Sequence, residues 1–193
     1  MLQNKLKNKN IILASGSPRR HELLKELGVN FSIKVKEIEE TYNTELKGAE
    51  ITNYLCKEKA AAFTNEVFEN DIIITADTIV WHNNKALEKP KNAAEAIQML
   101  QELSGKKHKV FSSICIKTKN SEHIISDVTS VSFKELSLKE IEFYVENYQP
   151  FDKAGAYGIQ EWIGLIGVTQ IEGSYFNVMG LPVHKLYEEL IKL

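Results

Sequence analysis

The sequence lacks the features that mark membrane, secreted and metal-cluster proteins. It has two cysteines and four prolines among 193 residues, and no apolar run approaches the roughly 20 residues of a membrane span. Cys56 and Cys115 do not have the spacing of a metal or redox pair, so we interpret them as free thiols. The first ten residues contain no apolar run of signal-peptide length, so we expect a cytoplasmic protein with no membrane partner.

The sequence also lacks an excess of charge of either sign. A net charge of −2 provides no overall basic surface for a nucleic-acid backbone, so we expect no nucleic-acid partner. Neither G-x-x-x-x-G-K-[ST] nor G-x-G-x-x-G after a strand occurs, and the five histidines are scattered. An anionic ligand would therefore have to be held by local charge, at a site other than a P-loop.

The composition is that of an ordinary globular protein, with 43% hydrophobic and 26% charged residues. We expect a single domain over residues 1–193, possibly with two lobes. Strand and helix patterns alternate at first and a hairpin follows, which predicts an α/β fold with a mixed sheet. The predicted strands cover 10–14, 31–35, 71–81, 107–118, 123–134 and 163–172; the predicted helices cover 18–27, 49–67, 93–104 and 138–147, with a last helix from Pro182 and a polar loop over 36–47.

The most informative stretch follows the first predicted strand. Ser15-Gly16-Ser17 forms a small turn, Ser17 is the expected N-cap of the next helix, and Pro18 suits its first position. Arg19 and Arg20 then stand in the first helical turn, where the helix dipole disfavours cations. A bound phosphate would relieve this conflict, because backbone N–H groups, serine hydroxyls and guanidinium groups would all point at it. The alternative is a pair of solvated arginines.

Two charged residues interrupt apolar patterns. Asp77 lies within a run of β-branched residues, where a carboxylate needs a partner, a metal or a proton. An aspartate that caps a turn at the strand end is an equal alternative. Lys59 falls four residues after Leu55 and four before Phe63, on or beside the apolar stripe of its helix. Taken alone, Lys59 is better explained as a lysine whose stem packs while its amine reaches water.

Three further positions carry weaker signals. Lys89 lies on a turn before a helix cap, and Glu40 lies in an acidic stretch that would ordinarily be a solvated face. Gln160 ends a loop of small residues, and its amide could read a base edge because it offers both a donor and an acceptor. In isolation, solvent exposure is the better explanation of Lys89 and Glu40, and the alternative for Gln160 is a residue that caps exposed backbone in a turn-rich connection.

In combination these motifs resemble the Maf family of nucleoside triphosphate pyrophosphatases over nearly the whole chain. The ordered set is specific, although each motif alone is weak. It comprises Ser15-Gly16-Ser17-Pro18-Arg19-Arg20, Lys59-Ala60, Ala76-Asp77-Thr78, Glu88-Lys89-Pro90, Leu103-Ser104-Gly105 with His108, Asp152 to Gln160, and Gly173-Ser174-Tyr175 through Pro182.

The resemblance implies an elongated α/β fold with two lobes and a central cleft, similar to inosine-triphosphate pyrophosphatases. It implies hydrolysis of a nucleoside triphosphate to the monophosphate and pyrophosphate, a house-cleaning activity that needs Mg²⁺ or Mn²⁺, and a homodimer. The family's proton acceptor matches Asp77, and its specificity positions match Arg19, Thr78 and Gln160, as in the dTTP and UTP branch. We place Glu40 beside Asp77 as a metal ligand.

These residues give a hypothesis and two rivals. In the hypothesis Ser15, Ser17, Arg19, Arg20, Lys59 and Lys89 face the phosphates, Asp77 activates water, and Thr78 and Gln160 meet the base. One rival is the same chemistry on another nucleotide, such as 7-methyl-GTP. The other is a non-catalytic nucleotide-binding regulator of septum formation.

Overall fold

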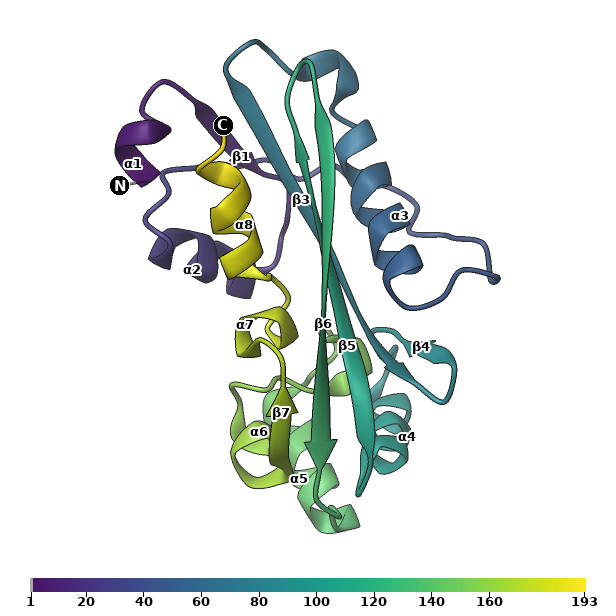
Figure 1. Cartoon of the computed structure of the whole chain (residues 1–193). Helices are drawn as coiled ribbons and strands as arrows, with labels where there is room; N and C mark the ends of the chain where they lie inside the picture. The colour runs from purple at the N-terminus through teal and green to yellow at the C-terminus, as the bar shows by residue number, and fades with distance from the viewer. Residues whose placement is uncertain (1) are drawn as a thin grey trace. The chain divides into compact units, whose positions relative to one another are not determined.

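Seven strands form one mixed sheet in the computed structural model, which describes residues 2–193. The strand order is β2-β1-β3-β5-β6-β7, and β4 pairs with β3. Helices flank the sheet, so the predicted mixed α/β class is confirmed (Figure 1). The strands are β1 (Asn10–Leu13), β2 (Ser32–Ile33), β3 (Asp71–His82), β4 (Lys85–Leu87), β5 (Lys107–Lys117), β6 (Glu122–Phe133) and β7 (Val168–Glu172).

The helices follow the predicted order, with short additions. They are α1 (Leu2–Lys5), α2 (Pro18–Glu26), α3 (Ala49–Ala61), α4 (Ala93–Leu103), α5 (Leu138–Tyr148), α6 (Trp162–Gly167), α7 (Tyr175–Val178) and α8 (Val183–Leu190), with 3-10 turns at Thr64–Glu66 and Ala154–Ala156. Among residues 2–193, none of these helices has the length and apolar character to cross a membrane.

The chain divides into two compact units, each built from separate segments. The first unit contains residues 1–77, 112–127 and 180–193, and the second contains 78–111 and 128–179. Strands β3, β5 and β6 contribute residues to both.

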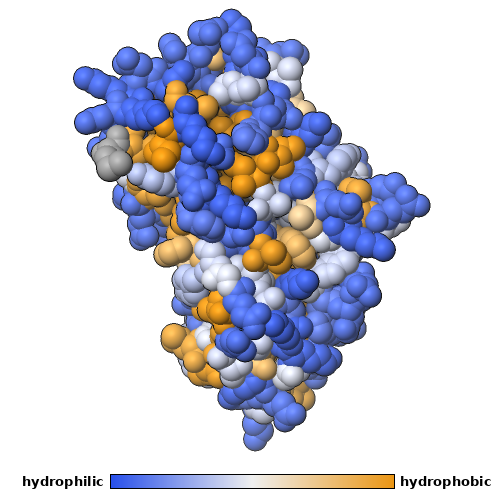
Figure 2. Space-filling model, viewed as in Figure 1, coloured by the Kyte–Doolittle hydropathy of each residue, from blue (hydrophilic) through white to orange (hydrophobic). Residues whose placement is uncertain are grey.

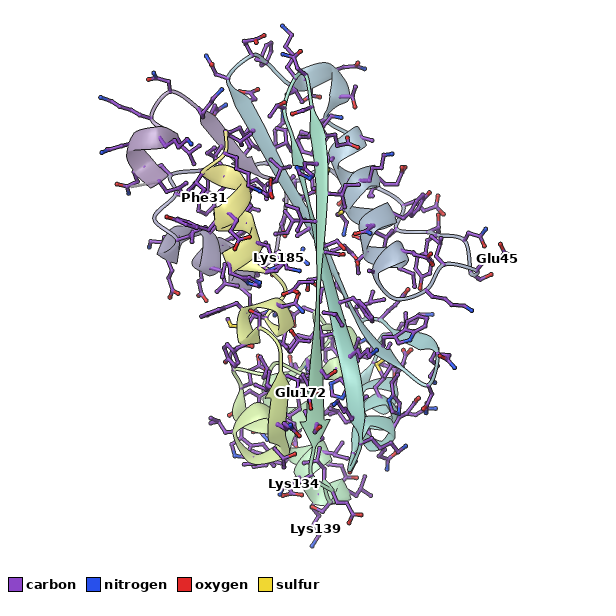
Figure 3. The ribbon with its side chains drawn as sticks, viewed as in Figure 1. Phe31, Glu45, Lys134, Lys139, Glu172 and Lys185 are labelled. Carbon is purple, nitrogen blue, oxygen red and sulfur yellow. The ribbon has the colours of Figure 1, made fainter. Side chains whose placement is uncertain are left out.

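In the first unit, β1 lies between β2 and β3 and is parallel to both. Figure 1 shows α3 on one side of β3, and α2 with α8 on the other. Lys185, labelled in Figure 3, lies on α8. Its Nζ contacts β6 by donating to Asp127 Oδ1 and to the Ser126 carbonyl, each at 2.8 Å.

In the second unit, α4, α5 and α6 contribute to an apolar core together with residues of β3, β5 and β6. Val80, Leu100, Val131, Tyr144 and Ile163 are each at most 2% exposed within this cluster. Both longer helices begin as the sequence predicts. Asn92 accepts from Glu95 N–H, and Ser137 forms a reciprocal capping box with Glu140.

The structure corrects three predicted elements. The helix expected over 49–67 ends at Ala61, and the strand expected over 31–35 covers only Ser32–Ile33. The strand expected over 163–172 covers only Val168–Glu172, because Trp162–Gly167 forms α6. The apolar run gave no periodicity that distinguishes the two states. The carbonyl of Glu161 starts the helix by accepting from Gly164 N–H at 2.9 Å and Leu165 N–H at 3.2 Å.

The surface seen in Figure 2 is mainly hydrophilic, with hydrophobic residues scattered over it. Exposed apolar side chains include Ile33, Phe68 and Leu165. Such scatter is normal for a globular protein and marks no binding face by itself.

Candidate active site

Parallel pairing of β1 with β3 brings the Ser15–Arg20 turn beside Asp77. Leu13 pairs with Ile74, and Ala14 N–H donates to the Ile74 carbonyl at 2.8 Å. Strand β1 ends there, whereas β3 continues through Asp77 and beyond. The Ser15–Arg20 turn therefore follows the carboxyl end of β1, on the side of the sheet toward which β3 runs on to Asp77.

The turn is ordered by its own side chains. Ser15 is 6% exposed, and its Oγ accepts from Ser17 N–H and from Arg20 NH1, each at 3.3 Å. Ser17 is the residue before α2, as predicted, but its side chain makes no capping hydrogen bond. The first-turn amides of α2 are therefore not capped by Ser17, and Arg19 and Arg20 do stand in that turn.

Arg20 connects the turn to β3 and to the segment before α8. Its Nε donates to the Gly180 carbonyl and its NH1 to the Ala76 carbonyl, each at 2.8 Å. Burial lowers the pKa of Arg20, and the nearby Asp77 carboxylate opposes that shift. Arg20 thus fixes the peptide next to Asp77, a structural role that its sequence position did not reveal.

His21 is a second residue whose role the sequence did not reveal. Its Nε2 lies 2.6 Å from the Ser15 carbonyl oxygen. Because a carbonyl can only accept, Nε2 carries the proton in this contact. The bond fixes the peptide of the turn from the side of α2, and a single histidine without a motif gave no signal for it.

The alternation of β3 places Asp77 against α3. Ile73 packs with Phe63, Thr75 Oγ1 donates to the Cys56 carbonyl at 2.6 Å, and Lys59 Nζ lies 2.7 Å from Asp77 Oδ1. Residues two apart on a strand share a face, so Ile73, Thr75 and Asp77 all point toward α3 and the residue Phe63 that follows it.

Lys59 and Asp77 form a largely buried ion pair. The Lys59 side chain is 16% exposed and that of Asp77 is 9% exposed. The snorkelling lysine that the helical spacing favours for Lys59 is therefore wrong, because its ammonium pairs with a buried carboxylate. The strand-end turn cap that was the alternative for Asp77 is likewise wrong, since β3 continues to His82.

Glu40 joins this pair from the loop that precedes α3. Its Oε1 lies 3.0 Å from Lys59 Nζ, and its side chain is 47% exposed. Two carboxylates thus converge on one ammonium, an arrangement of hard oxygen donors that suits Mg²⁺ or Mn²⁺. Among residues 2–193 there is no cluster of three or more His, Cys, Asp or Glu side chains that could hold a metal ion.

The remaining predicted residues belong to the second unit. Thr78 follows Asp77 on β3 and is half-buried. Lys89 is exposed after β4, and Gln160 is exposed in the turn before α6. Their roles in substrate binding stay predictions.

A pocket of about 400 Å³ in the second unit contains none of the residues predicted to bind substrate or metal. One residue of its lining, His108, is buried. His108 Nε2 lies 2.7 Å from the Tyr157 hydroxyl, and burial, assisted by His82, lowers the pKa of His108 to about 3. His108 is neutral at physiological pH and belongs to an aromatic cluster with Phe133 and Tyr157. The pocket is lined by Trp81, His82, Asn83, Asn84, Lys107, His108, Lys109 and Ser130.

Comparison with known proteins identifies the family. The model of the family described as "Maf-like protein" matches residues 10–193. The chain belongs to the Maf family. This confirms the resemblance that the ordered motifs indicate.

Two of the curated relatives match over nearly their whole length. The chain is 56% identical over 193 residues to a protein from Flavobacterium johnsoniae named dTTP/UTP pyrophosphatase, covering 100% of both chains. It is 53% identical over 191 residues to a protein of the same name from Flavobacterium psychrophilum, covering 99% of this chain and 98% of that one.

A solved structure, the Ham1 protein of Staphylococcus aureus, is 14% identical with a TM-score of 0.46, and the match covers 65% of this chain and 72% of that one.

Proposed function

We propose that this Maf-family protein hydrolyses dTTP and UTP to the nucleoside monophosphate and pyrophosphate. The observation that carries the proposal is the Lys59–Asp77 pair at 2.7 Å, held beside the Arg20-bound turn within the first unit. The names of the full-length relatives support the choice of substrate. The enzyme is therefore a hydrolase acting on an acid anhydride.

The Ser15–Arg20 turn binds the phosphates in this proposal. The α2 amides that Ser17 does not cap, together with Arg19, would meet phosphate oxygens. Arg20 and His21 keep the turn in place through backbone carbonyls. Because the donors of a rigid anion site are already in place, little free energy is needed to rearrange them as charge develops on the phosphate oxygens in the transition state. Such preorganised positioning and charge stabilisation is the main way proteins assist phosphoryl chemistry.

Asp77 is the proposed general base. Its Oδ2 is not engaged by the Lys59 contact described above, which uses Oδ1. Oδ2 would accept a proton from the water that attacks the α-phosphorus of the nucleotide, while Lys59 holds the carboxylate in position. Pyrophosphate then leaves with the P–O bond electrons.

Asp77 and Glu40 would hold a divalent cation, Mg²⁺ or Mn²⁺. When bound, such an ion neutralises charge on phosphate oxygens. Lys59 bridges the same two carboxylates, so the carboxylates are already gathered at one point before any ion arrives.

Thr78 and Gln160 read the base, and Lys89 adds positive charge toward the phosphates. A primary amide can both donate and accept, as the edge of uracil or thymine requires. A site built for that edge should reject bases that leave its polar groups unpaired.

The decisive test is a nucleotide panel with detection of pyrophosphate. UTP, dTTP, CTP, GTP, ITP and 7-methyl-GTP are each supplied with Mg²⁺ or Mn²⁺, and with neither ion. The proposal expects pyrophosphate release that is fastest with dTTP and UTP and depends on the ion. Fastest release from 7-methyl-GTP or a purine would contradict the substrate, and tight binding without release would contradict the enzyme.

Three further properties belong to the proposal. A homodimer is supported by the family resemblance alone. Action in the cytoplasm is supported by two buried free cysteines, which suit a reducing compartment. The absence of a nucleic-acid partner is supported by the net charge of −2.

A further inference from the structure

Gln160 stands in a tight turn at the start of α6. Glu161 N–H donates to the Gly158 carbonyl at 3.0 Å, which makes Ile159 and Gln160 the central residues of a β-turn. Ile159 is 6% exposed and packs in the core of the second unit, whereas Gln160 is exposed. The direction of the Gln160 side chain therefore depends on how the two ends of this turn are held.

One buried hydroxyl holds both ends. Tyr144 Oη accepts from Gly158 N–H at 2.9 Å and donates to Glu161 Oε2. Tyr144 lies on α5 and is 0% exposed, with its ring stacked on Tyr148 at 5.1 Å between centroids. Burial and the Glu161 carboxylate raise the pKa of Tyr144, so the hydroxyl keeps the proton it donates.

The Glu161 carboxylate, which accepts from Tyr144 through Oε2, is also held through its other oxygen. Glu161 Oε1 lies 3.1 Å from Lys153 Nζ, and Lys153 is 8% exposed. A Cβ added to Gly158 would lie 2.7 Å from Glu161 Cδ and 2.8 Å from Oε2. The carboxylate is thus packed onto the backbone of the turn, and any residue larger than glycine at position 158 would push the two apart.

We propose that Tyr144 is a positioning residue for base selection, because its hydroxyl sets the turn that presents Gln160. This inference rests on the proposed function, in which Gln160 meets the base. Tyr144 does not touch the substrate. It acts through the Gly158 and Glu161 ends of the turn and so influences which base is accepted more than the rate of the chemical step.

The test compares Tyr144→Phe with Tyr148→Phe. Each change removes one hydroxyl and keeps the ring, and the Tyr148 ring stacks on that of Tyr144. The readout is the ratio of kcat/KM for UTP to that for GTP. Loss of one hydrogen bond corresponds to roughly a 2- to 12-fold fall in that ratio for Tyr144→Phe. Tyr148→Phe should keep the wild-type ratio.

The Gln160→Ala variant distinguishes failure of the base-reading role of Gln160 from failure of the positioning role of Tyr144. An unchanged ratio in Gln160→Ala would overturn the base-reading role itself, and this inference with it. A lowered ratio in Gln160→Ala with a wild-type ratio in Tyr144→Phe would overturn only the positioning role. Adding Tyr144→Phe to Gln160→Ala should lower the ratio no further, and an additive fall would contradict action through Gln160.

Glu161→Gln is a second variant that tests the proposal if Tyr144→Phe does not fold. Glu161→Gln keeps the side-chain shape but removes the negative charge that Tyr144 and Lys153 contact. It should lower the same ratio in a protein whose thermal unfolding remains cooperative. A folded Glu161→Gln protein with the wild-type ratio would overturn the proposal.

Discussion

Replacing Lys59 with methionine removes the ammonium that joins Asp77 and Glu40. Breaking a buried ion pair by removing one partner costs about 3–5 kcal/mol, because the other charge remains buried. The Lys59 and Asp77 side chains are 16% and 9% exposed, whereas Glu40 is 47% exposed and adds little. We therefore expect Lys59→Met to lower the free energy of unfolding by about 3 kcal/mol.

Urea unfolding followed by circular dichroism measures this loss. With an m-value of about 2 kcal/mol/M, the midpoint should fall by about 1.5 M. Lys57→Met is the matched control, because Lys57 lies on the same helix and is exposed, and it should change stability by at most about 0.5 kcal/mol.

A double-mutant cycle isolates the cause. If the buried Asp77 charge is responsible for the loss, Asp77→Asn in the Lys59→Met background should recover at least about 1 kcal/mol. A loss below about 0.5 kcal/mol in Lys59→Met, or strictly additive effects in the double variant, would refute the reasoning.

Two further predictions concern the second unit and its stability. The unfolded chain protonates His108 near the ordinary histidine pKa of 6.5, whereas the folded protein does so only at a pKa of about 3. Stability is therefore fully present above pH 6.5 and falls as the pH drops toward 3, by about 2 kcal/mol between pH 7 and pH 5. Urea curves at both pH values should show this loss in the wild type and not in His108→Gln, and equal losses would contradict the assignment. Gly155→Ala should cost about 2–4 kcal/mol in thermal unfolding, because Gly155 has φ +67° and a Cβ would lie 2.7 Å from Val80 Cγ2. Gly28→Ala, at φ +77° with nothing within 4 Å, should cost only about 1 kcal/mol, and equal costs would show that the contact with Val80 is irrelevant.

Local patterns predicted the elements that carry the first-unit site. Helical spacing placed Lys59 on or beside the apolar stripe of its helix, and β-branched residues placed Asp77 inside a strand. The spacing could not say that these two side chains meet, because their contact depends on which face of β3 packs on α3. The sequence therefore predicted both candidates and left their partner open.

Long-range contacts explain what the sequence did not predict. The contact of Arg20 with the Gly180 carbonyl joins residues 160 positions apart, and no local pattern encodes it. The helix Trp162–Gly167 was predicted as a strand because six residues are too few for a helical period to appear. Tyr144 gave no signal because its hydroxyl acts on a turn that is formed elsewhere in the chain.

Asp77, held by Lys59, is the residue that we propose as the general base of the hydrolysis. The most direct measurement is pyrophosphate release from UTP by the wild type and by Asp77→Asn, with Mg²⁺ present and folding checked by circular dichroism. Loss of a general base lowers turnover by about 10²- to 10⁴-fold, and that is the fall we predict for the folded variant. A folded Asp77→Asn protein that keeps more than half of the wild-type rate would contradict the account.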